Sequence, residues 1–186
     1  NPLNTTPNLK RIAEDGYFNS EYYVPSEGTA RSMFTLLTAI PDVSTYKTAS
    51  RNPLIVNQNV IMDQFPGYRK FYFLGGNANW GQIRSVFSHN VEGVEIVEEG
   101  QFERKAVDVW GLSDLDLFKE VDRILNDVPD SQPFFAVVQA ASFHRPYTIP
   151  KDRDDFKEET YPQDLVRKAS FLNNEEMNSL RFSDYS

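Results

Sequence analysis

The chain has 186 residues, a length typical of one domain, and its 40% hydrophobic content, including 14 Phe, 9 Tyr and 2 Trp, is enough for a real core. Its 19 basic and 27 acidic residues give a net charge of -8, which argues against nonspecific binding to nucleic acid or to an anionic membrane surface. It contains no cysteine, so disulfides, thiolate zinc sites and cysteine nucleophiles are excluded, and no apolar run approaches the ~20 residues of a transmembrane helix.

Residues 6–16 (TPNLKRIAEDG) predict the first helix. Thr6 suits the N-cap, Pro7 the first helical position and Gly16 the C-terminal stop. Three apolar residues are expected to form its buried face: Leu9, Ile12 and Ala13. Residues 17–24 are aromatic and β-branched enough to predict a short strand that leads to the next turn.

The following stretch, residues 24–41 (VPSEGTARSMFTLLTAIP), is a small and polar turn that runs into a helix expected over residues 31–39. The apolar positions of that helix are Met33, Phe34, Leu36, Leu37 and Ile40. Gly28 permits a left-handed backbone just before the helix. A hydroxyl at Thr29 or Ser26 would lie in the positive field of the helix N-terminus, which suits a nucleophile that attacks a phosphate or sulfate ester. Alternatively, Thr29 or Ser26 simply caps the helix.

Two strands and a helix are predicted in the middle of the chain. Residues 41–59 are polar and irregular. Residues 70–74 indicate a buried strand that ends at Gly75-Gly76, and without a third glycine this pair is a weak dinucleotide-binding signal. Residues 79–87 predict a helix and residues 94–97 a short strand. The inward side chains of that helix are Ile83, Val86 and Phe87.

The second half of the chain adds one helix, one strand and a final helix. Residues 113–116 have capping-box spacing. The helix that follows has one apolar face: Leu117, Phe118, Val121, Ile124 and Leu125. Residues 133–138 (PFFAVV) are continuously apolar, as in a parallel strand covered on both faces. Residues 151–163 indicate a solvated loop, and the last helix is suggested by Leu172, Met177, Leu180 and Phe182. Strands that alternate with helices predict an α/β fold.

Few residues could carry chemistry. His144 and Arg145 follow the strand of residues 133–138, at the edge where ligands bind in open α/β sheets. His89 follows a helix, where an end or surface role is the simpler interpretation. Arg31 could neutralise an ester oxyanion or face solvent. Trp80 could be a binding platform or a core aromatic.

The chain resembles the sulfatase and alkaline-phosphatase superfamily, and within it the lipoteichoic acid synthase type of phosphoglycerol transferase. Four blocks carry the resemblance in the family's order: residues 6–16, 28–41, 71–87 (FYFLGGNANWGQIRSVF) and 133–147 (PFFAVVQAASFHRPY). The resemblance implies an alkaline-phosphatase-like sheet with helices on both faces. Residues 1–186 would then be a single catalytic-domain fragment, cut at both ends.

The same resemblance implies roles for particular residues. Thr29 matches the threonine that binds the metal and is transiently phosphorylated, and His144 matches the histidine that contacts the substrate phosphate. Trp80 matches an aromatic that lines the glycerophosphate pocket. Arg31 and Arg145 are further candidates for substrate binding.

Two departures bear on the substrate. The family's arginine near the pocket tryptophan is not matched in register, because Gln82 takes its place and Arg84 comes two residues later. The C/S-x-P-x-R motif of formylglycine sulfatases is absent, which favours Thr29 and phosphoester chemistry.

The resemblance also implies a divalent metal, Mn²⁺ or Mg²⁺ with Ca²⁺ as an alternative. The family's other metal ligands would precede residue 1 and follow residue 186, so we expect the fragment to be inactive and to hold no metal. The implied partner is a phospho- or sulfo-ester substrate, lipid-linked in the synthase type, and no nucleic acid. The implied location is an extracytoplasmic domain of a bacterial membrane-anchored protein of the cell envelope.

Two other functions stay open at this point. One is a sulfuric ester hydrolase on the same fold, which differs in the group transferred. The other is a non-catalytic module that binds a partner or a polysaccharide through a surface rich in Tyr and Phe.

Overall fold

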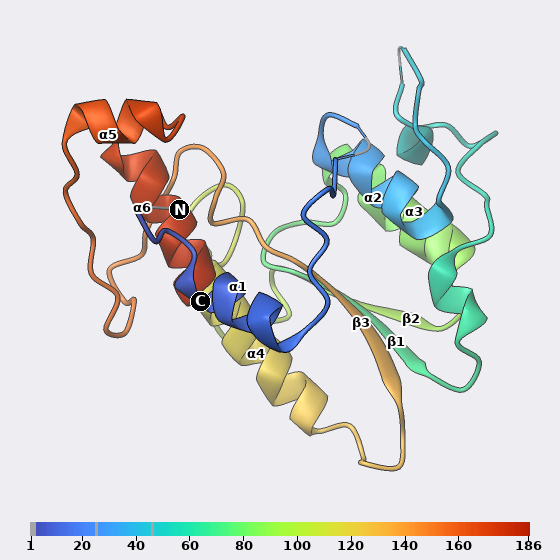
Figure 1. Ribbon diagram of the computed structural model, residues 1–186. Coiled ribbons are helices and arrows are strands. Elements are labelled where there is room, and N and C mark those ends of the chain that lie inside the picture. The colour runs from blue at the N-terminus through green and yellow to red at the C-terminus, as the bar shows by residue number, and fades with distance from the viewer. Residues whose placement is uncertain (1–2, 25, 46) are drawn as a thin grey trace.

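A parallel sheet of three strands forms the centre of the protein in a computed structural model that describes residues 3–24, 26–45 and 47–186 (Figure 1). β1 (Arg69–Leu74) lies between β2 (Val94–Val97) and β3 (Phe134–Gln139). The chain passes from β1 to β2 through α3 (Ile83–Asn90) and from β2 to β3 through α4 (Asp114–Asn126). Because all three strands run the same way, their carboxyl ends meet at one edge.

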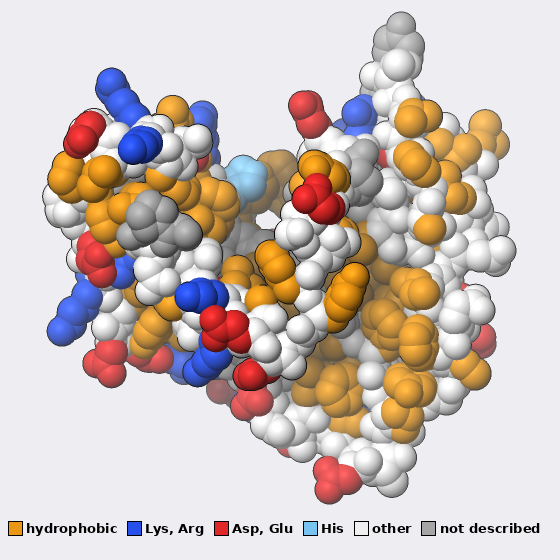
Figure 2. Space-filling model, in the orientation of Figure 1, with side chains coloured by type: hydrophobic (Ala, Val, Ile, Leu, Met, Phe, Trp, Pro, Cys, Tyr) orange, Lys and Arg blue, Asp and Glu red, His pale blue; other side chains and the backbone are white. Residues whose placement is uncertain are grey.

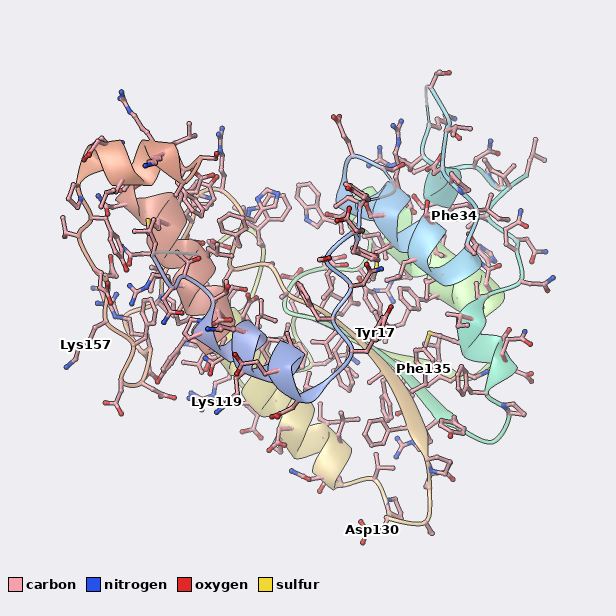
Figure 3. All side chains as sticks on the ribbon, in the orientation of Figure 1. Tyr17, Phe34, Lys119, Asp130, Phe135 and Lys157 are labelled. Atoms are coloured by element: carbon pink, nitrogen blue, oxygen red, sulfur yellow. The ribbon has the colours of Figure 1, made fainter. Side chains whose placement is uncertain are left out.

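The side chains of β1 point alternately into two cores, one on each face of the sheet. Tyr72 packs on the side of α3 and of α2 (Thr29–Thr38), and its ring stacks on Phe87 with 3.9 Å between centroids. Phe34 and Phe135, labelled in Figure 3, contribute to the same core. Phe71 and Phe73 instead join the apolar face of α4, so β1 is buried on both sides.

The remaining helices are short or lie at the ends of the chain. Their bounds are Pro7–Asp15 (α1), Gln163–Lys168 (α5), Asn174–Tyr185 (α6), Ala49–Arg51 (η1), Ile61–Gln64 (η2) and Trp80–Gln82 (η3). Figure 1 shows α2 and α3 on one side of the sheet and α1, α4 and α6 on the other. None of the helices among the described residues combines the length and the hydrophobicity that a membrane-spanning helix needs.

The α/β class and most of the central elements are confirmed. The strands predicted at 70–74, 94–97 and 133–138 form, and Ile83, Val86 and Phe87 are all buried. Ser113 caps α4, since its hydroxyl oxygen accepts the Asp116 N–H at 3.2 Å. The helix predicted at 31–39 begins two residues earlier, at Thr29.

The prediction of a buried face on α1 is wrong. No residue of α1 is buried in the described structure, and Leu9 and Ile12 are 57% and 63% exposed. The helix is held instead by Asp184 of α6, whose carboxylate accepts the N–H groups of Asn8 and Leu9 at 2.9 and 2.8 Å. A side chain distant in sequence thus satisfies the free donors of the first turn.

The ends of α1 and the segment after it also differ from expectation. Thr6 occupies the N-cap but makes no capping bond with its side chain, and Gly16 is extended, with φ -133°, rather than left-handed. Residues 17–24 form no strand: they are exposed, and Tyr17 (Figure 3) is 97% exposed. Pro25, in the next predicted turn, lies outside the described residues.

Three burial expectations need correction. β3 is not covered on both faces: it lies at the edge of the described sheet and is only half-buried, whereas β1 is the covered strand. On α2, Leu36 is exposed, and Ile40, which was expected on the same helix, lies beyond its end and is exposed as well. The loop at 151–163 is solvated except for Phe156, which is buried against Phe182 of α6. α5 was not predicted, and Leu172 lies before α6 rather than in it.

Candidate functional site

A cavity of about 660 Å³ lies at the carboxyl edge of the sheet. Its wall includes residues 74–77 after β1, residues 139–141 after β3, the N-terminal turn of α2 and Ser183 of α6. Figure 2 shows the surface hollowed between the part of the molecule that carries α2 and the part that carries α5 and α6. This is the edge at which open α/β sheets bind ligands.

Thr29 lies on this wall as the first residue of α2, and it is exposed. The capping alternative is wrong for both hydroxyls, because Gly28 (φ 86°) occupies the N-cap and no side chain caps the helix. Ser26 donates its hydroxyl to the Asp42 carbonyl oxygen at 3.3 Å. The Thr29 hydroxyl has no hydrogen-bond partner among the described residues, so it is available to a ligand.

His144 lies on the same wall, in the turn that follows β3, and its ring is exposed. Its Nδ1 lies 2.9 Å from the Arg145 carbonyl oxygen. Since a carbonyl can only accept, Nδ1 carries the proton of this bond and Nε2 remains free to meet a ligand. His89, by contrast, is exposed in the last turn of α3 and away from the cavity wall, as its helix-end interpretation predicted.

A row of three aromatic rings forms one side of the cavity. Trp110 lies in the middle, with its ring centroid 3.9 Å from that of His144 and 5.1 Å from that of Trp80. Its Nε1 donates to the Arg145 carbonyl oxygen at 2.5 Å. Trp80 is 57% exposed, so it belongs to the cavity rather than to the core. Sequence reasoning missed Trp110 altogether.

The glycines around Trp110 explain how it comes to lie there. The Leu112 N–H donates to the Gly75 carbonyl oxygen at 3.1 Å, so the turn after Trp110 crosses the end of β1 directly. A Cβ on Gly76 would lie 2.5 Å from the Trp110 carbonyl oxygen, and one on Gly111 would lie 1.9 Å from that of Gly75. The Gly75-Gly76 pair is therefore a site of close backbone approach. This pair was the signal that could have led to Trp110.

The predicted arginines occupy different places. Arg31 lies on the cavity wall and donates to the Ser44 carbonyl oxygen at 2.7 Å. Arg145 is exposed and lies off the wall, and the neighbouring Tyr147 hydroxyl raises the pKa of its guanidinium. Arg145 contributes to the site through its carbonyl oxygen, which accepts hydrogen bonds from the rings of His144 and Trp110 and so orients them.

The arginine nearest to Trp80 in sequence is not available to a ligand. Arg84 is ion-paired with Glu98 and donates to Asn79 at 2.9 Å, and Gln82 is exposed off the wall. A guanidinium from another segment, that of Arg51, lies on the wall instead. No local pattern pointed to Arg51, because it comes from the irregular segment at 41–59.

A buried carboxylate supports the turn that carries His144. Asp114, the first residue of α4, is fully buried, and its Oδ1 accepts the N–H groups of Ala141 and Ser142 at 2.7 and 3.0 Å. Its Oδ2 accepts the Ser183 hydroxyl at 2.7 Å. Asp114 therefore ties α4, the end of β3 and α6 together behind the cavity.

A second buried group supports the floor of the cavity. Tyr72 donates its hydroxyl to Gln139 Oε1 at 2.7 Å, which fixes the side chain at the end of β3. Burial raises the pKa of Tyr72, and the charge of Glu98 adds to the rise. Tyr72 is therefore a neutral donor at any physiological pH.

The described residues do not form a complete metal site by themselves. No group of three or more His, Cys, Asp or Glu side chains gathers among them in an arrangement that could hold a metal ion. Thr29 could supply one oxygen ligand, and Glu27 and His144 line the same cavity.

A family model described as sulfatase matches residues 1–185. Among solved structures, an alkaline phosphatase superfamily protein from Vibrio parahaemolyticus is 25% identical, with a TM-score of 0.77 over 98% of this chain and 43% of that one. The lipoteichoic acid synthase LtaP from Listeria monocytogenes is 18% identical, with a TM-score of 0.78 over 97% of this chain and 44% of that one.

The phosphoglycerol transferase GacH from Streptococcus pyogenes, solved in complex with sn-glycerol-1-phosphate, is 20% identical, with a TM-score of 0.64 over 97% of this chain and 48% of that one. The present chain thus spans less than half the length of each of these structures. The match over nearly the whole of this chain confirms an alkaline-phosphatase-like α/β fold.

Proposed function

Because the chain belongs to the sulfatase family, we propose that the full-length protein transfers or hydrolyses a phosphoester of the phosphoglycerol type, with Thr29 as the nucleophile. The observation that supports this most directly is that one cavity is lined by the Thr29 hydroxyl, at a helix N-terminus, and by the His144 ring. Neither this hydroxyl nor the Nε2 of His144 has a hydrogen-bond partner among the described residues. Residues 1–186 would be part of its catalytic domain.

The chemistry follows from where these groups lie. The Thr29 oxygen attacks phosphorus in line with the leaving oxygen, so a P–O bond to Thr29 forms as the bond to the leaving oxygen breaks. The Thr29 hydroxyl loses its proton to water, and the leaving oxygen takes up a proton from water and departs as an alcohol. Unpaired N–H groups in the first turn of α2 favour the negative charge on the phosphoryl oxygens. With a proton on each ring nitrogen, His144 donates through Nε2–H to one of these oxygens, and Arg31 adds positive charge to the same wall. An acceptor alcohol or water then releases the group from Thr29.

Two observations support a phosphoglycerol ester as the substrate: the side chains that line the cavity, and the ligand of a solved structure that shares the fold. Trp80 and Trp110 offer apolar ring faces beside the polar groups, which suits a polyol or lipid portion next to a phosphate. The GacH structure, which shares the fold, holds sn-glycerol-1-phosphate. Together these favour a phosphoglycerol ester over an aryl sulfate.

A divalent metal, Mn²⁺ or Mg²⁺ or alternatively Ca²⁺, belongs to this proposal, with Thr29 as one ligand. When bound, it would activate the hydroxyl and neutralise phosphoryl charge. The other ligands would come from parts of the full-length protein outside these 186 residues. We place the domain outside the cytoplasm, on a bacterial membrane-anchored protein of the cell envelope, because a lipid-linked substrate would be met there.

The test compares full-length wild-type protein with Thr29→Ala and Thr29→Ser, on phosphatidylglycerol and on an aryl sulfate. We expect Thr29→Ala to lose at least a thousandfold in turnover and Thr29→Ser to keep part of it, because Ser retains a hydroxyl. Mass spectrometry of wild-type protein should find a glycerophosphoryl group on the peptide that contains Thr29. Full turnover by Thr29→Ala would refute the assignment, and turnover of aryl sulfate alone would make the protein a sulfatase.

A further inference from the structure

Two guanidinium groups lie on the cavity wall, and they differ in what they already bind. Arg31 is half-buried and donates to the Ser44 carbonyl oxygen at 2.7 Å. The Arg51 side chain is exposed and makes no hydrogen bond or ion pair with any residue that the structure describes. All the donors of Arg51 are therefore free to meet a ligand.

Arg51 combines the lack of a described side-chain partner with a place on the cavity wall, whereas the exposed Arg11 and Arg167 also lack a described partner but lie off the wall. Several other arginines bind a carboxylate, namely Arg69, Arg84, Arg123, Arg153 and Arg181. With 27 acidic residues against 19 basic ones, the chain has carboxylates to spare. A guanidinium on a cavity wall that no described carboxylate neutralises is suited to bind an anionic ligand.

The backbone beneath Arg51 is firmly held. Arg51 ends η1, and the two residues before it, Ala49 and Ser50, are buried. The Ala49 N–H donates to the Asp42 carboxylate at 2.7 Å. The Ser50 hydroxyl donates to the Gly81 carbonyl oxygen at 2.6 Å, which ties η1 to the turn that carries Trp80. Binding through Arg51 thus orders only one side chain, which lowers its entropic cost.

We propose that Arg51 is a substrate-binding residue that holds the phosphoryl group through its guanidinium fork. Arg51 would supply the positive charge that the family resemblance led us to expect from an arginine next to Trp80. At that place Gln82 is neutral, and Arg84 is bound to Glu98. The planar fork matches two oxygens of a phosphate at once, which a lysine at the same place could not do. This inference rests on the proposed function and names the residue that recognises its anionic group.

The experiment measures binding apart from turnover. Full-length protein with Thr29→Ala, which stops transfer, is titrated calorimetrically with sn-glycerol-1-phosphate and with inorganic phosphate. Adding Arg51→Ala should weaken both ligands by about tenfold to a hundredfold, and Arg51→Lys should recover only part of the loss. The charge-matched control is Arg123→Ala, which removes an exposed arginine of α4 that binds Glu120 in its own helix, and it should bind as well as the parent.

Two results would overturn the role of Arg51. One is unchanged affinity for both ligands in the Arg51→Ala protein while its unfolding temperature matches the parent. The other is weaker binding of sn-glycerol-1-phosphate with unchanged binding of inorganic phosphate, which would place Arg51 at the glycerol instead. Neither result depends on turnover, so the role of Arg51 and the role of Thr29 as nucleophile can fail separately.

Discussion

Replacing Asp114 by Ala is expected to destabilise the protein and to loosen the turn that carries His144. The Asp114 side chain is fully buried and accepts three hydrogen bonds, from the N–H groups of Ala141 and Ser142 and from the Ser183 hydroxyl. Alanine leaves all three donors without their acceptor. The buried N–H groups then bear most of the cost.

The magnitude follows from these bonds. Each hydrogen bond to a charged group contributes ~1.5–3 kcal/mol, but removing a buried charge also relieves its desolvation, so we expect a net loss of about 3–5 kcal/mol in the free energy of unfolding. For a chain of this length that corresponds to a fall of roughly 10 °C in Tm. Asp114→Asn keeps an acceptor for both N–H groups and can donate to Ser183, so it should cost only ~1–2 kcal/mol.

The assay is urea unfolding of the wild-type, Asp114→Ala and Asp114→Asn proteins, together with hydrogen exchange at residues 141 and 142. Asp116→Ala is the matched control, because it removes a carboxylate from the same first turn of α4 without touching those N–H groups. It should cost about 1 kcal/mol, for the lost cap contact and helix dipole. If Asp114→Ala lost less than ~1 kcal/mol, or if Asp114→Asn were equally damaging, the reasoning would be wrong.

Three further predictions concern backbone approach, acidity and metal binding. Gly111→Ala should prevent native folding or lower the free energy of unfolding by more than ~3 kcal/mol, because its Cβ would lie 1.9 Å from a carbonyl oxygen. Gly100→Ala is the control: Gly100 also has a positive φ but lies in open space, so the loss should be only ~1–2 kcal/mol. Thermal unfolding distinguishes the two variants. Although burial alone would raise the pKa of Asp42, hydrogen bonds from Ala49 and Ser44 and the charge of Arg31 lower it overall. A pKa that is lowered in the folded state gives stability that is present above the unfolded pKa of ~3.9 and is lost as the pH falls through the folded value. Asp42→Asn should therefore flatten the dependence of the unfolding free energy on pH below about pH 4. An unchanged slope would contradict this. Calorimetric titration of the 186-residue chain with Mn²⁺ should show no tight stoichiometric site, since its described residues form no cluster of three ligands, and a tight site would contradict this.

Much of the fold could be predicted because local patterns carry it. The alternation of strands and helices gave the α/β class, and the positions of Ile83, Val86 and Phe87 indicated which side of α3 would be buried. The order of burial within the sheet could not be predicted. An apolar run is typical of a covered strand, but only the neighbouring elements determine whether the strand is central and buried on both faces, as β1 is, or at the edge and half-buried, as β3 is.

The errors at α1 have the same origin. Leu9 and Ile12 have the spacing of a buried face, but both are more than half exposed, and the first turn is satisfied by Asp184, more than 170 residues away in sequence. Capping by a distant carboxylate leaves no trace in the local sequence. Local spacing therefore predicted the helix but not its surroundings.

At the candidate site, the sequence by itself determined the residue types and their local settings. Thr29 follows a glycine at the start of a helix, and His144 follows a strand that ends at the ligand-binding edge. Only the tertiary structure decided which groups share the cavity. It brought in Trp110 through the crossing of Gly111 over Gly75, and Arg51 through the packing of η1. The physical reason is that propensity and hydrophobic period act over a few residues, whereas a cavity is formed by backbones that approach one another from distant parts of the chain.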